Sequence, residues 1–209
     1  QSFNYHFNQT KILKPFKVNI NFEKYKRIFN LFSKKIRAGE TYQIKICTKY
    51  KNKSEIDPVS FFWKLMKVNS SPEAFMIRDK NYSIVSCSPE TLIEKKGLKV
   101  TTKPIAGTLK KNQKLNKSKA LNFFKNNNKE TKEHNMIVDM ERNDLSKICK
   151  PGSVVIKRKK YVEEYKHLYH YVSTIEGRLK NNINLKNIIK SMMPGGSVIG
   201  CPKIRTLQL

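Results

Sequence analysis

Cysteine is scarce in this chain of 209 residues: there are four, and they stand far apart. No two form a C-x-x-C pair and none has a close histidine partner, which excludes a zinc ribbon and leaves no disulfide framework. No apolar run reaches the roughly eighteen residues that a membrane span requires, and no signal peptide is visible. These absences favour a reducing, cytoplasmic compartment and predict no membrane partner.

Acidic residues are also few. The chain has 16 Asp and Glu against 43 Lys and Arg, which gives a formal net charge of +27. Such an excess suggests nucleic-acid binding, because clustered cations release counterions from a phosphate backbone. However, only seven of the basic residues are arginine, the side chain favoured for phosphates and base edges. We therefore expect solvated lysine-rich faces and no nucleic acid partner, with a basic nucleic-acid-binding module as the alternative.

The length predicts a single domain over residues 1–209, enough to bury about 70% of the unfolded surface. The chain begins at Gln1 rather than Met, and Leu209 falls inside an expected helix. We therefore expect it to be a fragment of a longer protein.

Hydrophobic periodicity predicts an α+β domain of antiparallel sheets with helices packed outside, because strands and helices follow one another without regular alternation. A polar, lysine- and asparagine-rich stretch at 110–128 is expected to be a mobile loop and the start of a helix. The expected helices cover residues 22–37, 58–68, 130–148 and 185–193, and the expected strands cover 41–48, 74–77, 82–87, 91–95, 98–102, 153–158 and 161–175.

Two glycine-bearing segments stand next to apolar runs: PIAGT at 104–108 and PGGSVIGCPK at 194–203. Glycine lets main-chain N–H groups approach a ligand closely, and the neighbouring Thr108 and Ser197 hydroxyls add donors and acceptors. Read as turns, the two segments predict a small anionic substrate held from two sides. Plain turns without a ligand are the alternative.

Glu130 and Glu133 are three residues apart on an expected helix, so their carboxylates share a face. Hard oxygen ligands of this type suit Mg²⁺, whereas the alternative is a solvated helix start. His170, in a strand-like segment, is a candidate general acid or base or a hydrogen-bonded core residue, and His167 is the weaker candidate. Glu90 is either a buried acid or an exposed charge at a strand end.

Six motifs follow one another along the chain: GETYQ at 39–43, SPE at 88–90, PIAGT, KEHNMIVDMERNDL at 132–145, HYVSTIEGRL at 170–179 and PGGSVIGCPKIR at 194–205. Taken together, they resemble the chorismate-utilising enzymes, and among them anthranilate synthase component I and aminodeoxychorismate synthase component I. The resemblance covers nearly the whole chain. It implies two antiparallel sheets packed in a sandwich with helices outside, incomplete here at the C-terminus, and a cleft that binds Mg²⁺ and chorismate.

The resemblance also implies roles for single residues. Glu133 matches the family's magnesium-binding glutamate and Glu130 the nearby acid that guards the same site. His170 matches the histidine near the ring hydroxyl that leaves, and with Glu90 and Thr108 it completes the expected catalytic set. The expected substrate-binding residues are Gln43, Gly107, Thr108, Gly195, Gly196, Ser197 and Lys203.

Two positions discriminate among the reactions of the family. Isochorismate synthases carry a lysine base where this chain resembles the ammonia-using members with Gln43, and water needs such a base whereas ammonia has a free lone pair. Aminodeoxychorismate synthases commonly carry a nucleophilic lysine where this chain has Ala106. Against this, HYVSTI and PGGS are more similar to the aminodeoxychorismate branch.

We therefore expect an enzyme of tryptophan biosynthesis, a lyase that converts chorismate and ammonia to anthranilate and pyruvate, with ammonia supplied by a glutamine amidotransferase subunit. The alternatives are aminodeoxychorismate synthase component I, of the folate and p-aminobenzoate branch, and a non-catalytic scaffold for the amidotransferase. Glu73 stands where tryptophan-inhibited members have an aromatic residue, so tryptophan feedback is not expected. The arginine, glycines and second metal-binding glutamate that follow GCPKIR in the family are absent, so this piece alone is expected to catalyse poorly.

Overall fold

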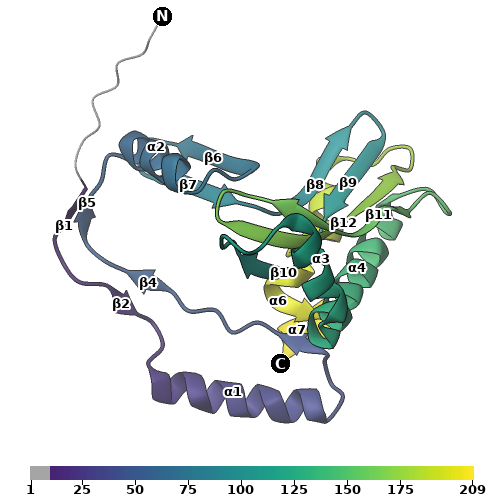
Figure 1. Ribbon diagram of the computed structural model, residues 1–209, viewed down its shortest axis with the longest axis horizontal. Coiled ribbons are helices and arrows are strands. Elements are labelled where there is room, and N and C mark those ends of the chain that lie inside the picture. Colours follow the sequence, from purple (N-terminus) through teal and green to yellow (C-terminus); the bar gives the residue numbers. More distant parts are fainter. Residues whose placement is uncertain (1–9) are drawn as a thin grey trace, which may run out of the picture. The chain divides into compact units, whose positions relative to one another are not determined.

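The computed structural model describes residues 10–209 (Figure 1). The chain divides into two compact units. One contains the described residues up to Ser33 together with Ile46–Pro89, and the other contains Lys34–Lys45 and Glu90–Leu209. The expectation of a single domain over 1–209 stays a prediction.

The first unit is built from short strand pairs and one helix on a hairpin. Helix α2 (Pro58–Val68) packs on the antiparallel hairpin of β6 (Glu73–Arg78) and β7 (Ser83–Ser88). It begins where sequence chemistry predicts, because the Asp57 carboxylate accepts the Ser60 N–H at 3.0 Å and Pro58 occupies the first turn. The remaining strands pair as β1 (Lys11–Ile12) with β5 (Ser54–Glu55) and β2 (Lys17–Val18) with β4 (Tyr50–Lys51).

Helix α1 (Phe22–Arg37) runs from the first unit into the second. The Asn21 side chain accepts the Lys24 N–H at 2.9 Å at its start, and Gly39, with φ of 74°, follows its end. The Asn21 side chain thus satisfies a free N–H at the helix start, and the positive φ of Gly39 suits the turn that ends the helix.

The second unit is organised by an antiparallel sheet in the order β10-β12-β9-β8, with β11 also paired to β12. Strand β12 lies at its centre, and most of its side chains are buried. Its first half pairs with β10 and its second half with β9. The strands are β8 (Thr91–Lys96), β9 (Lys99–Lys103), β10 (Ile105–Lys110), β11 (Val155–Glu164) and β12 (Leu168–Arg178).

The long helix α4 (Asn128–Ile148) lies against β10 and β12 (Figure 1). Its buried residues recur at helical spacing, so one face meets the sheet and forms a core in which Val138 and Leu145 contact Val100 and Ile175. The other elements of this unit are β3 (Gln43–Ile44), α3 (Lys117–Asn126), α5 (Leu185–Met192), α6 (Gly196–Ile199), β13 (Gly200–Cys201) and α7 (Lys203–Gln208). The predicted α+β class with antiparallel sheets is confirmed.

Several predicted boundaries were wrong. The strand expected at 41–48 is reduced to β3, which pairs with only the two residues of β13. PIAGT, interpreted as a turn, belongs to strand β10, which carries a register shift between Ile105 and Thr108. The segment 161–175 is divided between β11 and β12 by a turn that contains His167.

The polar stretch at 110–128 contains more structure than its composition predicts. It includes the full helix α3, which buries Ala120 and Phe124. The Phe124 ring stacks on Tyr171 of β12, with centroids 5.0 Å apart. Two apolar side chains among lysines and asparagines are therefore enough to anchor this helix, because both fall on the face that meets the sheet. Within residues 10–209, no helix combines the length and the apolar character that crossing a bilayer requires.

Candidate active site

The site can be built outward from the first turns of α4. Glu133 is half-buried on this helix, and its Oε1 accepts a hydrogen bond from the Gln43 amide at 2.9 Å. The Lys45 ammonium lies 3.6 Å from the same oxygen. Gln43 and Lys45 are two residues apart at β3, so their side chains share a face. The GETYQ motif and the KEHNM motif thus meet at one carboxylate.

Gln43 is held in place by a close backbone approach. Cys201 pairs with Gln43 and Gly200 with Ile44 in the β13–β3 ladder. Gly200 has a φ of 128°, and a Cβ there would lie 2.0 Å from the Gln43 carbonyl oxygen. Only glycine fits, which explains why the second glycine segment lies beside Gln43.

Gly107 brings the PIAGT motif beside Glu130, the partner of Glu133 in the predicted pair of acids. Its φ is 115°, and a Cβ there would lie 2.9 Å from the Phe124 ring and 3.1 Å from Glu130 Oε2. A side chain at this position would displace the Glu130 carboxylate. The absence of a side chain at Gly107 therefore allows strand β10 and Glu130 to approach.

Thr108 and His170 face each other across the β10–β12 ladder. The Thr108 hydroxyl lies 3.0 Å from Nδ1 of His170, which is only 6% exposed. Burial lowers the pKa of His170, and a hydrogen bond to the backbone of Gly107 opposes the shift. The imidazole is therefore neutral at pH 7 and oriented by the threonine hydroxyl. His167, the weaker candidate, lies in the turn between β11 and β12.

Glu90 connects the two glycine segments. Its Oε1 accepts the Ile105 N–H at 3.3 Å, and its Oε2 accepts the Ser197 hydroxyl at 3.4 Å. Burial raises the pKa of Glu90, while these hydrogen bonds and the Lys45 charge oppose the shift. Of the two alternatives for Glu90, the buried acid therefore fits its surroundings better than the exposed charge at a strand end.

Sequence reasoning missed a buried histidine next to Glu133. His134 is 1% exposed, with Nδ1 3.3 Å from the Ala106 carbonyl and Nε2 2.7 Å from the Ser173 hydroxyl. The carbonyl can only accept, so Nδ1 carries the proton and Nε2 accepts from Ser173. Desolvation lowers the pKa of His134 to about 4. His134 is three residues before Ile137 and four before Val138, so helical spacing places it on the apolar face of α4. This spacing was the signal in the sequence that could have predicted its burial.

A second missed group is Glu141, which is 3% exposed. Its carboxyl contacts the Thr102 hydroxyl. Desolvation raises the pKa of Glu141 to about 8, and the neighbouring charges of Glu90 and Asp144 act in the same direction. The group is therefore mostly protonated at pH 7.

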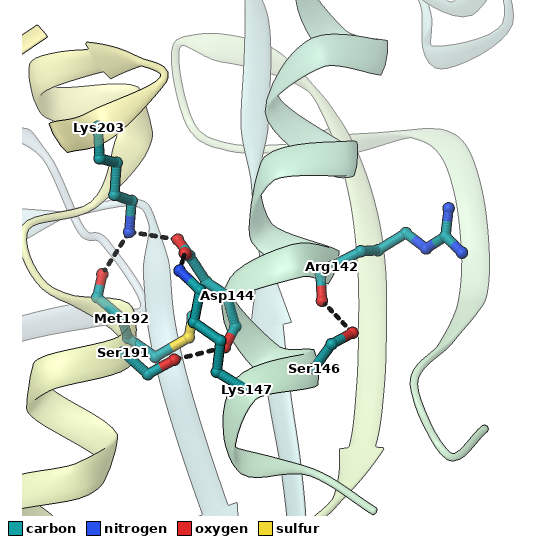
Figure 2. Close-up of polar contacts among 7 residues, drawn as sticks. All are labelled: Arg142, Asp144, Ser146, Lys147, Ser191, Met192 and Lys203. Carbon is teal, nitrogen blue, oxygen red and sulfur yellow. Dashed lines mark hydrogen bonds and ion pairs between the residues drawn. The ribbon is translucent and has the colours of Figure 1, made fainter. Parts of the chain in front are cut away.

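Lys203, expected to bind substrate, has protein partners (Figure 2). Its ammonium forms an ion pair with Asp144 Oδ2 and donates to the Met192 carbonyl at 3.2 Å. Gly196, also expected to bind substrate, packs where a Cβ would collide with the Met140 side chain. Gly195 is buried, and its carbonyl accepts the N–H groups of Val198 and Ile199. Substrate contacts by these three residues stay predictions.

No cluster of three or more His, Cys, Asp or Glu that could hold a metal occurs in the described part of the chain. Glu130 and Glu133 nevertheless fit Mg²⁺, because this ion takes one or two protein carboxylates together with water and substrate oxygens. Both are half-buried on one face of α4, where metal could reach them.

An antiparallel α+β scaffold thus brings two helix carboxylates, two glycine segments and a hydroxyl-bound histidine into one unit. Comparison with known proteins places this arrangement: the chain belongs to the chorismate binding enzyme family, which matches residues 1–209. It is 34% identical to aminodeoxychorismate synthase component 1 of Bacillus subtilis (strain 168) and 35% identical to anthranilate synthase component 1 1 of Haloarcula marismortui, each over 83% of this chain.

The crystal structure of anthranilate synthase component I from Streptococcus pneumoniae TIGR4 superimposes with a TM-score of 0.83 at 30% identity, over 93% of this chain and 43% of that one. The chain spans only 37% and 36% of the two curated relatives. The family match identifies the chain as part of a chorismate binding enzyme.

Proposed function

We propose that the full-length protein that carries this chain converts chorismate and ammonia to anthranilate, pyruvate and water. It does so in the cytoplasm with Mg²⁺, and a glutamine amidotransferase subunit supplies the ammonia for this step of tryptophan biosynthesis. The names of the relatives support the proposal, because anthranilate synthase component I recurs among the similar proteins and solved structures.

Ala106 is the residue that favours anthranilate formation over a reaction that ends at aminodeoxychorismate. Its methyl group is 5% exposed and packs with Ile137 and Met140. The position therefore offers no amine that could form a covalent bond to the substrate ring. Gln43, whose amide donates to Glu133, likewise offers no base to activate water.

Glu130 and Glu133 would hold the magnesium ion. Bound Mg²⁺ supplies a Lewis acid that stabilises negative charge developing on the substrate carboxylate. The Thr108 and Ser197 hydroxyls, with N–H groups of the two glycine segments, would bind carboxylate oxygens and fix the ring. Positioning of this kind is the main contribution of the chain's own residues.

His170 is suited to moving the proton. Burial lowers its pKa, so the imidazole rests neutral; it can take the proton that the added ammonia loses and pass a proton to the ring hydroxyl, which leaves as water. Ammonia adds to the ring and loses one proton, so the number of protons gained by the leaving hydroxyl equals the number lost by the new amine. Loss of the enolpyruvyl group as pyruvate then makes the ring aromatic. Thr108 keeps the imidazole oriented throughout.

Aminodeoxychorismate synthase component I is the second candidate, and the 34% identity to the Bacillus subtilis protein of that name favours it. The two candidates differ in whether pyruvate is released. The test therefore measures two products at once.

The full-length protein is incubated with chorismate, Mg²⁺ and ammonium. Anthranilate is followed by fluorescence, and pyruvate by coupled reduction with lactate dehydrogenase. We expect both to appear at equal rates. Aminodeoxychorismate without pyruvate would select the second candidate. The absence of any amination would reject both and favour a scaffold for the amidotransferase.

A further inference from the structure

A buried ion pair between Asp144 and Lys203 links the two ends of the second glycine segment to helix α4. Asp144 lies on α4 and is 2% exposed, and the Lys203 side chain, at the start of α7, is 14% exposed. Lys203 reaches Asp144 from one end of the segment 193–202. It also donates to the Met192 carbonyl at the other end, 3.2 Å away.

A further hydrogen bond ties the same end to the same residue. The Ser191 hydroxyl donates to the Asp144 backbone carbonyl. Figure 2 shows the three connections converging on Asp144 and Lys203, with α4 on one side and the α5–α7 region on the other. Both ends of the segment are therefore fastened to one residue of α4.

The segment so fastened contains little regular secondary structure. Its helix α6 has four residues, and its strand β13 has two. Yet it places the Ser197 hydroxyl 3.4 Å from Glu90, and its ladder with β3 holds Gln43 at Glu133. A shift at its base would move Ser197 and Gln43 together.

We propose that Asp144 and Lys203 are positioning residues that fix the segment 193–202 in its substrate-binding conformation. The link to substrate rests on the proposed function, whereas the conformational effect does not. Lys203 acts through Ser197 and Gln43 and needs no contact with the substrate.

The chain contains a matched control for charge. Lys147 pairs with the same carboxylate, Nζ to Oδ1 at 2.8 Å, but it is 53% exposed and lies on the same helix as Asp144. It therefore neutralises Asp144 without fastening the segment to α4. Lys147→Met removes one cation from Asp144, as Lys203→Met does, and leaves the closure intact.

The test compares both variants in the full-length protein by hydrogen exchange and steady-state kinetics. Lys203→Met should speed exchange of the Val198 and Ile199 amides, which bond to Gly195, at least tenfold. It should also raise the KM for chorismate at least fivefold. A loss of folded protein alone would lower kcat and leave KM unchanged. Lys147→Met should change each quantity less than twofold.

Removing one partner of a buried pair often unfolds a protein, so a neutral double variant, Asp144→Asn with Lys203→Met, keeps the test decisive. We expect it to recover thermal stability while exchange stays fast and KM stays high. Normal exchange and a normal KM in this variant would overturn the proposal. If the wild-type protein makes no product from chorismate, the proposed function fails. The hydrogen-exchange rates of the Val198 and Ile199 amides then decide by themselves whether Asp144 and Lys203 fix the segment 193–202.

Discussion

The Thr108 hydroxyl and Nδ1 of His170 lie 3.0 Å apart, although the two residues are 62 positions apart in the chain. The pairing of β10 with β12 sets this distance, because Thr108 and His170 are register partners in the ladder. A residue of the PIAGT motif therefore orients the candidate proton carrier of the HYVSTI motif.

Replacing Thr108 by valine tests this relationship. The variant keeps the shape of the side chain and removes the hydroxyl, so the imidazole loses its orienting partner. We expect kcat to fall roughly tenfold or more, which corresponds to about 1.4 kcal/mol or more of lost transition-state stabilisation. The measurement is steady-state anthranilate formation by the full-length protein. The control is Thr174→Val on β12, the strand of His170; it removes a hydroxyl bonded to Tyr161 of β11 and should retain activity.

Glu133→Gln tests the proposed metal role. The amide lacks the negative charge that Mg²⁺ requires, so Mg²⁺-dependent turnover should fall by at least about 100-fold. The measurement is turnover against Mg²⁺ concentration. Glu94→Gln, at an acid of β8 that pairs with Lys96, should behave as wild type. Unchanged turnover in Glu133→Gln would refute the role.

Lys45→Met should strengthen magnesium binding. The Lys45 ammonium lies 3.6 Å from Glu133 Oε1 and opposes a second cation at that carboxylate. Removing it should lower the Mg²⁺ dissociation constant roughly threefold to fivefold, measured by isothermal titration at low ionic strength. Lys45→Arg retains the charge and should bind Mg²⁺ as wild type does. Weaker binding by Lys45→Met would show that the lysine supports the metal site instead.

The buried Glu141 predicts a pH-dependent stability. Its pKa is raised to about 8 from the model-peptide value of 4.5, so between these values the folded protein holds a proton that the unfolded chain releases. The free energy of unfolding therefore falls as pH rises through this window, and the full contribution is present only below it. Glu141→Gln lacks this loss.

The stability difference between Glu141→Gln and wild type should accordingly shift in favour of the variant by roughly 2 kcal/mol from pH 6 to pH 8. Urea denaturation of the full-length protein at both pH values measures it. Glu94→Gln should show no such shift, because the hydrogen bond from Lys96 holds the pKa of Glu94 below its ordinary value and the group stays ionised at both pH values. A constant difference for Glu141→Gln would contradict the protonated state.

Gly200→Ala tests the backbone approach that holds Gln43. A Cβ at Gly200 would meet the Gln43 carbonyl oxygen at 2.0 Å, in addition to the strain of a positive φ. We expect a loss of roughly 2 kcal/mol or more in unfolding free energy. Gly152 also has a positive φ, of 73°, but open space around it, so Gly152→Ala measures the cost of a left-handed backbone without a collision and should cost about 1 kcal/mol. Equal losses in the two variants would exclude the collision.

The sequence by itself determined most of the elements and the motifs from which the candidate site is built. Helices α1, α2 and α5 follow from spacing and caps, because these signals lie within a few residues of one another. The motifs located Glu133, Thr108 and His170, and all three lie in the same unit. Composition misled at α3, where two buried side chains outweigh a polar surface.

Only the tertiary structure decided which polar groups are paired and how they are charged. The Lys203–Asp144 pair, the Ser173–His134 hydrogen bond and the raised pKa of Glu141 all join residues from different elements. The physical reason is that desolvation and partner choice depend on which surfaces close over a group in three dimensions. Hydrophobic periodicity records which face of a helix is buried, but it does not record what that face meets.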